Sequence, residues 1–262
     1  MRKLFLTVLL LTMAGAAGAE TLREPVDRTI DIRPGGEVSL VNINGKITIT
    51  SWDQPRVRLQ AEKYVESRDE QAAKKAMQEL RIDVKATANG VTIETRQPRN
   101  DGASGLLEAL FGDHVNMGVR YELKVPRSVN LNVENTNGSV HVEDLSGRLN
   151  LETTNGRIEV ARCSGSVNAG TTNGAIHAQL LQVASGASMH LETTNGGITL
   201  AIPPTLAANI EAGTTNGSVS TDVPITTTRF EKHSLRGTMN GGGALIRLST
   251  TNGGIRINKA GT

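Results

Sequence analysis

Apolar and polar residues alternate along the second half of the chain, and Asn-Gly pairs interrupt the alternation at near-regular intervals. Leu131 and Val133 precede one such pair, and Val140 and Val142 follow it. A period of two is typical of strands with one buried face. A second interruption, Ser-Gly, follows about nine residues after the asparagine in the first repeats. Each repeat is therefore predicted to run strand, turn, strand, turn.

The Asn-Gly pairs belong to one set of repeats. Successive asparagines are 18, 18, 22, 21 and 36 residues apart, and the last step is twice 18. These asparagines are Asn137, Asn155, Asn173, Asn195, Asn216 and Asn252. An outlying copy of the pattern, Asn44-Gly45, lies near the N-terminus.

Two arrangements fit this pattern. Asn-Gly favours tight hairpins and hence an antiparallel meander, whereas equivalent strands stacked in parallel would make each repeat one rung of a coil. The same residue types recur at the same place in each repeat, and only stacked rungs place residues of the same type directly above one another. We therefore predict an all-β parallel β-solenoid with two-strand rungs of about 18 residues, cornered by an asparagine ladder. The glycine after each asparagine is expected to supply a positive φ.

Inward positions follow from the same register. Thr153 and its equivalents, two residues before the asparagine, are predicted to face inward and bond the corner backbone. Cys163 lies eight residues after Asn155, as Leu181 does after Asn173, so both are predicted to fill one inward corner column.

The first half of the chain departs from the repeat. Ser67 and Glu70 resemble a capping box, and apolar residues follow at helical spacing, so one short inserted α-helix is predicted at 67–80. A hairpin is predicted around Asn89-Gly90. The expected organisation is a signal peptide at 1–19, an N-terminal rung with helix and hairpin insertion at 20–128, and the Asn-Gly repeat solenoid at 129–262. Residues 20–262 are expected to form one structural domain.

The N-terminus has the zones of a secretory signal. Arg2 and Lys3 precede an apolar run, Leu4 to Met13, and small residues end at Ala19, where cleavage is expected. The apolar run is too short for a transmembrane span, which needs roughly 20 residues. Glu20, rather than a cysteine, follows the cleavage point, which argues against a lipid anchor. We expect export to the periplasm or beyond, including the cell surface.

Charge excludes one class of partner. A signal that carries two of the 28 basic residues leaves 26 basic and 26 acidic residues. Nucleic-acid binding depends on a basic excess that neutralises phosphates, so no nucleic-acid partner is expected. A single cysteine cannot form an internal disulfide.

Taken together, the motifs resemble the bacterial putative adhesin family, a β-strand-repeat domain of unknown function. The matching residues are Trp52-Asp53, the run Tyr121 to Pro126, the Thr-Asn-Gly repeats, and Gly241 to Gly243 before the last repeat. The resemblance spans nearly the whole mature chain. It implies an extracytoplasmic β-solenoid with no established catalysis.

An apolar cluster departs from that family pattern. Leu106, Leu107, Leu110 and Phe111 lie among glycines, where polar loops are more usual. We predict a contact segment here, with two alternatives: a plug over the sheet edge beside the helix, or an exposed patch for a partner protein or a membrane surface.

Two outward columns carry side chains that are capable of chemistry. Glu134, Glu152 and Glu192 form a carboxylate column that Gly170 interrupts, and it is expected to be a solvated face. His141, Glu159 and His177 would stack on consecutive rungs and could suit zinc, although such a column is more often plain surface. We predict no catalytic, cofactor-binding or metal-ligating residues and no cofactor.

The predicted function is therefore a non-catalytic binding or structural protein of the bacterial cell envelope, adhesin-like, with an unknown protein or a surface polysaccharide as partner. The alternative is a carbohydrate-active β-solenoid, either a polysaccharide binder or a lyase. A sugar binder usually offers aromatic platforms, and residues 129–223 contain no Phe, Tyr or Trp.

Overall fold

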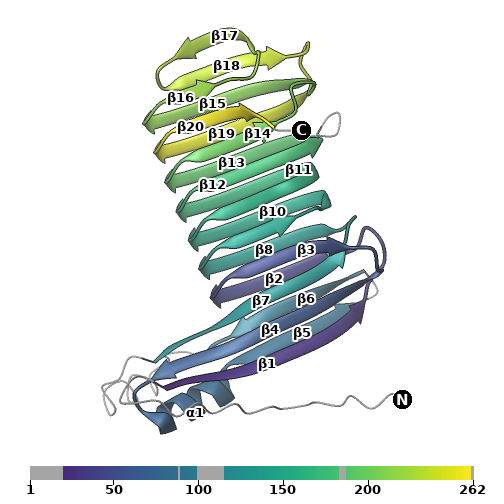
Figure 1. Ribbon diagram of the computed structural model, residues 1–262, viewed down its shortest axis with the longest axis vertical. Helices are drawn as coiled ribbons and strands as arrows, with labels where there is room; N and C mark the ends of the chain where they lie inside the picture. The colour runs from purple at the N-terminus through teal and green to yellow at the C-terminus, as the bar shows by residue number, and fades with distance from the viewer. Residues whose placement is uncertain (1–19, 88, 99–114, 183–186, 261–262) are drawn as a thin grey trace.

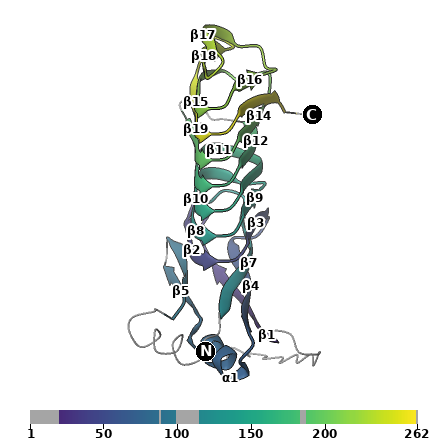
Figure 2. The ribbon, with the colours of Figure 1, turned by 90° about the vertical axis from the view of Figure 1, so that its left-hand side faces the viewer.

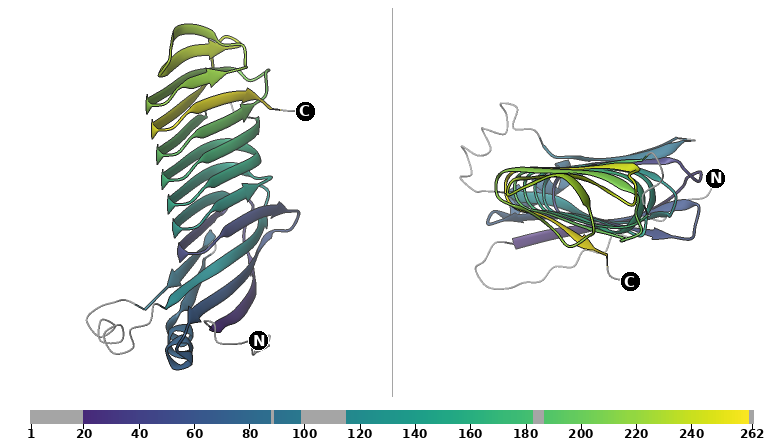
Figure 3. Two further views of the ribbon diagram at one scale, coloured as in Figure 1. Left: turned by 60° about the vertical axis from the view of Figure 1, so that its left-hand side comes forward. Right: turned by 90° about the horizontal axis from the view of Figure 1, so that it is seen from above.

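Two sheets face each other along the length of the molecule and enclose its core (Figure 2). The computed structural model describes residues 20–87, 89–98, 115–182 and 187–260. Strands account for most of these residues, and one α-helix accompanies them. Viewed end on, the chain forms a flattened coil (Figure 3). The predicted all-β class with one helix is confirmed.

Sheet 1 carries the strand that enters each Asn-Gly corner. Its strands lie in the spatial order β5 (Arg81–Thr87), β6 (Gly90–Arg96), β2 (Glu37–Asn44), β8 (Asn130–Asn137), β10 (Ser146–Asn155), the second half of β11 (Ile158–Asn173), β13 (Ser188–Asn195), β19 (Ala244–Asn252), β15 (Ala208–Asn216), β18 (Ser234–Met239) and β17 (Thr226–Glu231).

Sheet 2 carries the strand that leaves each corner. Its strands lie in the order β1 (Glu20–Asp31), β4 (Arg56–Ser67), β7 (Asn116–Pro126), β3 (Ile47–Trp52), β9 (Val140–Glu143), the first half of β11, β12 (Ile176–Gln182), β14 (Ile198–Ile202), β20 (Ile255–Lys259) and β16 (Val219–Thr221). The long strand β11 passes from one sheet into the other.

Strand directions are mixed, which corrects the prediction of a parallel solenoid for the whole chain. Equivalent strands of the repeats pair in parallel, as β10 does with β8 and with β11. At the N-terminal end β1, β4 and β7 pair antiparallel, and at the C-terminal end β15, β18 and β17 do so. Antiparallel strands therefore close both ends of the stack, while the strands in its middle pair in parallel.

The order of rungs in space differs from their order in the chain. β19 lies between β13 and β15, and β20 lies between β14 and β16 (Figure 1). The last rung is thus inserted beneath the one that precedes it in sequence. The rungs of Asn195 and Asn216 follow each other in the sequence but are not neighbours in space, because the rung of Asn252 separates them. At the other end, β2 and β3 stack directly on β8 and β9.

Aliphatic side chains from both sheets fill the interior, with Leu149, Leu151 and Ile158 fully buried. Cys163 is buried as predicted, and burial raises the pKa of its thiol to about 11. The prediction for Leu181 is wrong, since 49% of this residue is exposed and Leu180 lies opposite Cys163 instead. A register shift around Arg162, which has a φ of 50°, displaces the column by one residue.

The helix α1 (Glu70–Glu79) packs against β1 and β4 at the N-terminal end of sheet 2. Its N-cap is Asp69, whose carboxylate accepts from the backbone N–H of Gln71 and Ala72, so the predicted capping box at Ser67 is wrong. The predicted hairpin around Asn89-Gly90 is confirmed by the antiparallel pair β5 and β6. The predicted contact segment, with Leu106, Leu107, Leu110 and Phe111, lies outside the described residues.

Candidate functional site

The corner asparagines form a single ladder along one side of the molecule. From Asn137 onward, each Nδ2 donates over 2.7–2.9 Å to the Oδ1 of the asparagine that precedes it in space. The spatial order is Asn44, Asn137, Asn155, Asn173, Asn195, Asn252 and Asn216. The outlying Asn44 therefore heads the ladder, and its own Nδ2 donates to the carbonyl of Met117 at 3.0 Å. This ladder fixes the register of the rungs.

Behind the ladder, a threonine lies two residues before each asparagine from Asn155 onward and faces inward. Thr171 donates from Oγ1 to the carbonyl of Gly156 at 3.1 Å, and Thr193 does the same to Gly174 at 2.9 Å. The carbonyl that accepts always belongs to the corner glycine of the adjacent rung. The predicted inward threonines thus tie the corners of consecutive rungs together.

The outer face of sheet 1 is a set of polar rows, one residue per rung. The row five residues before the ladder asparagine contains Asn132, Asn150, Asn168, His190, Arg247 and Glu211, in spatial order. The first three form a second amide ladder, with Nδ2 to Oδ1 distances of 2.7 Å. Towards the C-terminal end the row changes from amides to charged groups.

At that end the outer face is hollowed. The hollow has a volume of about 530 Å³, and the lining residues include Gly213, Ser234 and Ser249 together with Arg229, Arg236 and Arg247. Gly213 and Ser249 occupy the row in which other rungs carry Glu134, Glu152 and Glu192. Small side chains at these positions leave space that a glutamate would fill.

One carboxylate joins two of the three arginines. Glu211 accepts from Nη2 of Arg247 at 3.1 Å and pairs with Nη2 of Arg236 at 3.1 Å, while Arg229 pairs with Glu231 at 2.8 Å. The arginine side chains are 54–67% exposed. Each guanidinium has five N–H donors, and these pairs engage one or two of them. The hollow can therefore offer several donors to an anionic group.

Sequence reasoning missed this hollow. Arg247 and Glu211 each lie five residues before a ladder asparagine, so their shared row could have been found from the repeat. Their contact depends on the insertion of the last rung, and Arg236 and Arg229 reach the hollow from the hairpin β17–β18. The repeat gives no signal for either feature.

The predicted histidine column is present, with Glu159 paired to His141 on one side and to His177 on the other. His141 Nδ1 lies 3.4 Å from Glu159, and its Nε2 lies 3.5 Å from Glu143. Within the described ranges, no three His, Cys, Asp or Glu side chains are grouped so that they could hold a metal ion. The predicted carboxylate column also aligns, with Gly170 between Glu152 and Glu192.

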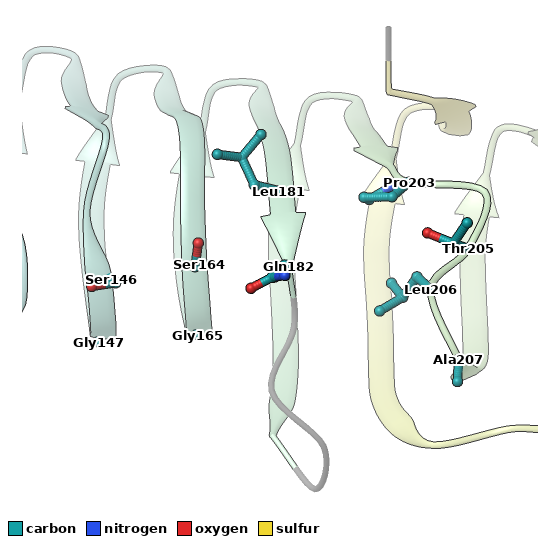
Figure 4. Close-up of a pocket in the computed structure, with 10 residues that line it drawn as sticks. All are labelled: Ser146, Gly147, Ser164, Gly165, Leu181, Gln182, Pro203, Thr205, Leu206 and Ala207. Atoms are coloured by element: carbon teal, nitrogen blue, oxygen red, sulfur yellow. The ribbon is translucent and has the colours of Figure 1, made fainter. Parts of the chain in front are cut away.

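A second groove of about 620 Å³ lies at the opposite corner of the coil. Figure 4 shows Leu181 and Gln182 in its middle, Ser146 and Ser164 on one side, and the segment 203–207 on the other. Its described lining combines hydroxyl, amide and apolar groups and includes no charged side chain. It offers less for recognition than the arginine-lined hollow.

None of the described residues belongs to a helix with the length and hydrophobicity that a membrane crossing requires.

Comparison with known proteins identifies a family that matches most of the chain. The model of the family described as Toastrack DUF4097 matches residues 38–258. No curated protein matches the chain. A "putative cell adhesion protein" from Clostridium sporogenes ATCC 15579 is 12% identical, with 90% of this chain and 100% of that one covered and a TM-score of 0.46. A "putative adhesin" from Bacteroides fragilis NCTC 9343 is 11% identical, with 90% and 97% covered and a TM-score of 0.39.

Proposed function

The chain belongs to the Toastrack DUF4097 family, and from that premise we propose that it is an exported, non-catalytic binding protein of the bacterial cell envelope. In this proposal it is adhesin-like, because its stacked rungs present a fixed polar face to another surface molecule. The partner class is an anionic surface polymer, such as a polysaccharide with carboxylate or sulfate groups.

Export is supported by the charged, apolar and small-residue zones of the first nineteen residues. The predicted signal peptide at 1–19 lies outside the described residues. Mass spectrometry of the protein recovered from an envelope fraction tests this step. A mature N-terminus at Glu20 is expected, and an intact Met1 in a cytoplasmic fraction would refute export.

The observation that carries the binding proposal is the arginine-lined hollow at the end of the polar rows. Guanidinium groups bind carboxylate and sulfate oxygens through paired N–H donors. Exposed ion pairs contribute little free energy, about 0–1 kcal/mol, so an acidic group of a partner can displace Glu211 at small cost. The regular rows beside the hollow suit a partner that also repeats.

Binding of the mature protein to three immobilised polymers tests the proposal: polygalacturonate, dextran sulfate and neutral dextran. We expect binding to one or both acidic polymers, weakened by salt because exposed charges are screened. A triple change of Arg229, Arg236 and Arg247 to Gln should weaken it by at least about tenfold, a loss of 1.4 kcal/mol. A control triple change of Arg81, Arg157 and Arg256 to Gln removes the same charge from other exposed positions and should have little effect.

Equal losses of affinity in both triple variants would show that net charge alone drives binding, and this would overturn the proposed site. Binding to neutral dextran but to neither acidic polymer would overturn the anionic partner class. The alternative function, a polysaccharide lyase, predicts that the acidic polymer is shortened during incubation. Unchanged polymer length under conditions that support binding favours the non-catalytic function.

A further inference from the structure

The strand β17 is the outermost strand of sheet 1 at the C-terminal end (Figure 1). Among the described strands it pairs with β18 alone, and all six of its residues are exposed. Residues of an antiparallel pair alternate between those that exchange hydrogen bonds and those that do not. About half of the backbone N–H and C=O groups of β17 therefore point to an open edge, which is a template for another strand.

Phe230 lies on the inner face of this edge strand. Its cross-strand neighbour is Leu235, which is 1% exposed and closes the end of the core. Phe230 itself is 59% exposed, the largest value among the described large hydrophobic residues. Sheet 2 ends at the three-residue strand β16, so no strand of that sheet lies opposite Phe230. An apolar ring is thus left uncovered at an open edge.

The charges that flank Phe230 make this edge self-complementary. Arg229 and Glu231 lie on the face opposite to Phe230 and pair with each other at 2.8 Å. When two copies of β17 pair antiparallel around Phe230, each Arg229 faces the Glu231 of the other copy, and the two phenylalanines face each other. Opposite charges and aromatic pairs directly across a ladder are favourable.

We propose that β17 pairs with β17 of a second copy of this chain, so that sheet 1 continues through a two-fold symmetric dimer. The register shift between Thr227 and Arg229 limits the paired segment to the part of β17 nearest the turn. The dimer is therefore weak and forms at high protein concentration. It places two arginine-lined hollows side by side, since Thr228 and Arg229 line the hollow, and so doubles the valence of the binding face.

Disulfide trapping tests the register. In the mature protein, Phe230→Cys should form an intermolecular disulfide under mild oxidation, because paired Cα atoms of an antiparallel ladder lie about 5.5 Å apart. Thr226→Cys is the matched control on the same strand, where the two Cα atoms would lie about 25 Å apart. The native Cys163 is buried and does not compete. Equal crosslinking of both variants, or crosslinking of neither, overturns the register.

Charge reversal tests the interface independently. In sedimentation experiments over a concentration series, Arg229→Glu and Glu231→Arg should each raise the dimer Kd about tenfold or more, since like charges then meet twice. The double reversal should restore dimerisation, and circular dichroism should confirm that every variant is folded. A monomer at the highest soluble concentration would overturn the proposal. Oligomers larger than dimers would overturn it in favour of head-to-tail pairing between β17 and β5.

Discussion

At the scale of single residues, the corner glycines are required by close approach between backbones. A Cβ built on Gly174 would lie 1.9 Å from the carbonyl oxygen of Gly156, and one on Gly196 would lie 1.9 Å from that of Gly174. The φ of these glycines lies outside the left-handed region, which only Gly45 and Gly138 of the corner set adopt. The predicted reason, a positive φ, is therefore wrong for most corners. The stacking distance itself excludes a side chain.

Two glycines of the same rung should respond in opposite ways to alanine, because only one of them lies at a corner. Gly174→Ala should lower the free energy of unfolding by about 2–3 kcal/mol, because two rungs must move apart. Gly170→Ala should leave it unchanged or raise it by about 0.5–1 kcal/mol, since nothing lies within 4 Å of its Cβ and glycine weakens a strand. Denaturant titration measures both. Equal destabilisation would show that the corner has no special constraint.

Tyr121 is a buried tyrosine that is hydrogen-bonded to Thr95, and we expect it to make the protein less stable at alkaline pH. Burial raises the pKa of Tyr121 to about 12, although its hydrogen bond with Thr95 at 2.7 Å acts in the opposite direction. In the unfolded chain the phenol ionises near pH 10. In the native state Tyr121 keeps its phenolic proton between pH 10 and about 12. Its contribution to the free energy of unfolding is therefore complete below pH 10 and is lost across that window.

Tyr121→Phe should therefore flatten the decline of unfolding free energy from pH 10 to about 12, by roughly 2–3 kcal/mol. Tyr64→Phe is the comparison, because Tyr64 is the other of the two tyrosines and is only half-buried, although burial raises its pKa in the same direction. Absorbance titration of the Tyr64→Phe protein reports Tyr121 alone. Ionisation near pH 10 in the folded protein would contradict the prediction.

The repeat predicts residue positions wherever one residue type recurs. The asparagine ladder and the inward threonines follow from register alone, because residues of the same type stack on neighbouring rungs. Leu181 could not be placed in this way, since the bulge at Arg162 adds a residue to one rung and not to the next. Such a shift leaves no mark in the apolar pattern.

At the scale of elements, one buried lysine holds the helix against sheet 2. Lys63 on β4 donates from Nζ to the carbonyls of Leu80 at 3.2 Å and Met77 at 3.4 Å, and it pairs with Glu24 on β1 at 3.0 Å. A cation at a helix C-terminus satisfies carbonyls that lack partners within the helix. The side chain of Lys63 is 10% exposed, so water can replace few of these contacts.

Lys63→Met keeps the aliphatic stem and removes the donor. We expect a loss of about 1–3 kcal/mol, the cost of leaving buried polar groups without a partner. Hydrogen exchange should increase in residues 70–80 more than in the repeats. Lys74→Met, on the exposed face of the same helix, should change stability by less than about 0.5 kcal/mol. Unchanged exchange in Lys63→Met would show that the helix docks through apolar contacts alone.

The helix and the hairpin β5–β6 could be predicted because each has a local signal, a 3.6-residue period or an Asn-Gly turn. β1 and the hairpin β17–β18 could not. β1 carries charged residues and Pro25, and of the strands that the structure describes it pairs with β4 alone, as edge strands do. β17 is exposed along its length and has no buried face to give a period.

At the scale of the whole molecule, the insertion of the last rung decides what the C-terminal end can do. β13 would accept β15 in the same parallel register that it offers β19, because all three end in Thr-Thr-Asn. The repeat therefore cannot reveal the true order. The insertion brings Arg247 between His190 and Glu211 and so creates the arginine-lined hollow. The binding site that we propose is a consequence of topology as much as of composition.

Because the last rung lies between two others, its removal should affect residues that precede it in the chain. A protein that ends at Gly243 loses the partner of β13 on one side and of β15 on the other. We expect rapid proteolysis within residues 203–240 and retained protection of the described strands from β1 to β12, since those strands keep every neighbour. A synthetic peptide of residues 243–260, added in trans, should restore protection by filling the vacant rung. A peptide in which Leu248 and Ile255 are replaced by Asp is the control, because both side chains are buried in the core and their charges would lie there unpaired. If the shortened protein instead resists proteolysis throughout, β15 has moved onto β13, and the chain would then have two competing orders of its rungs rather than one.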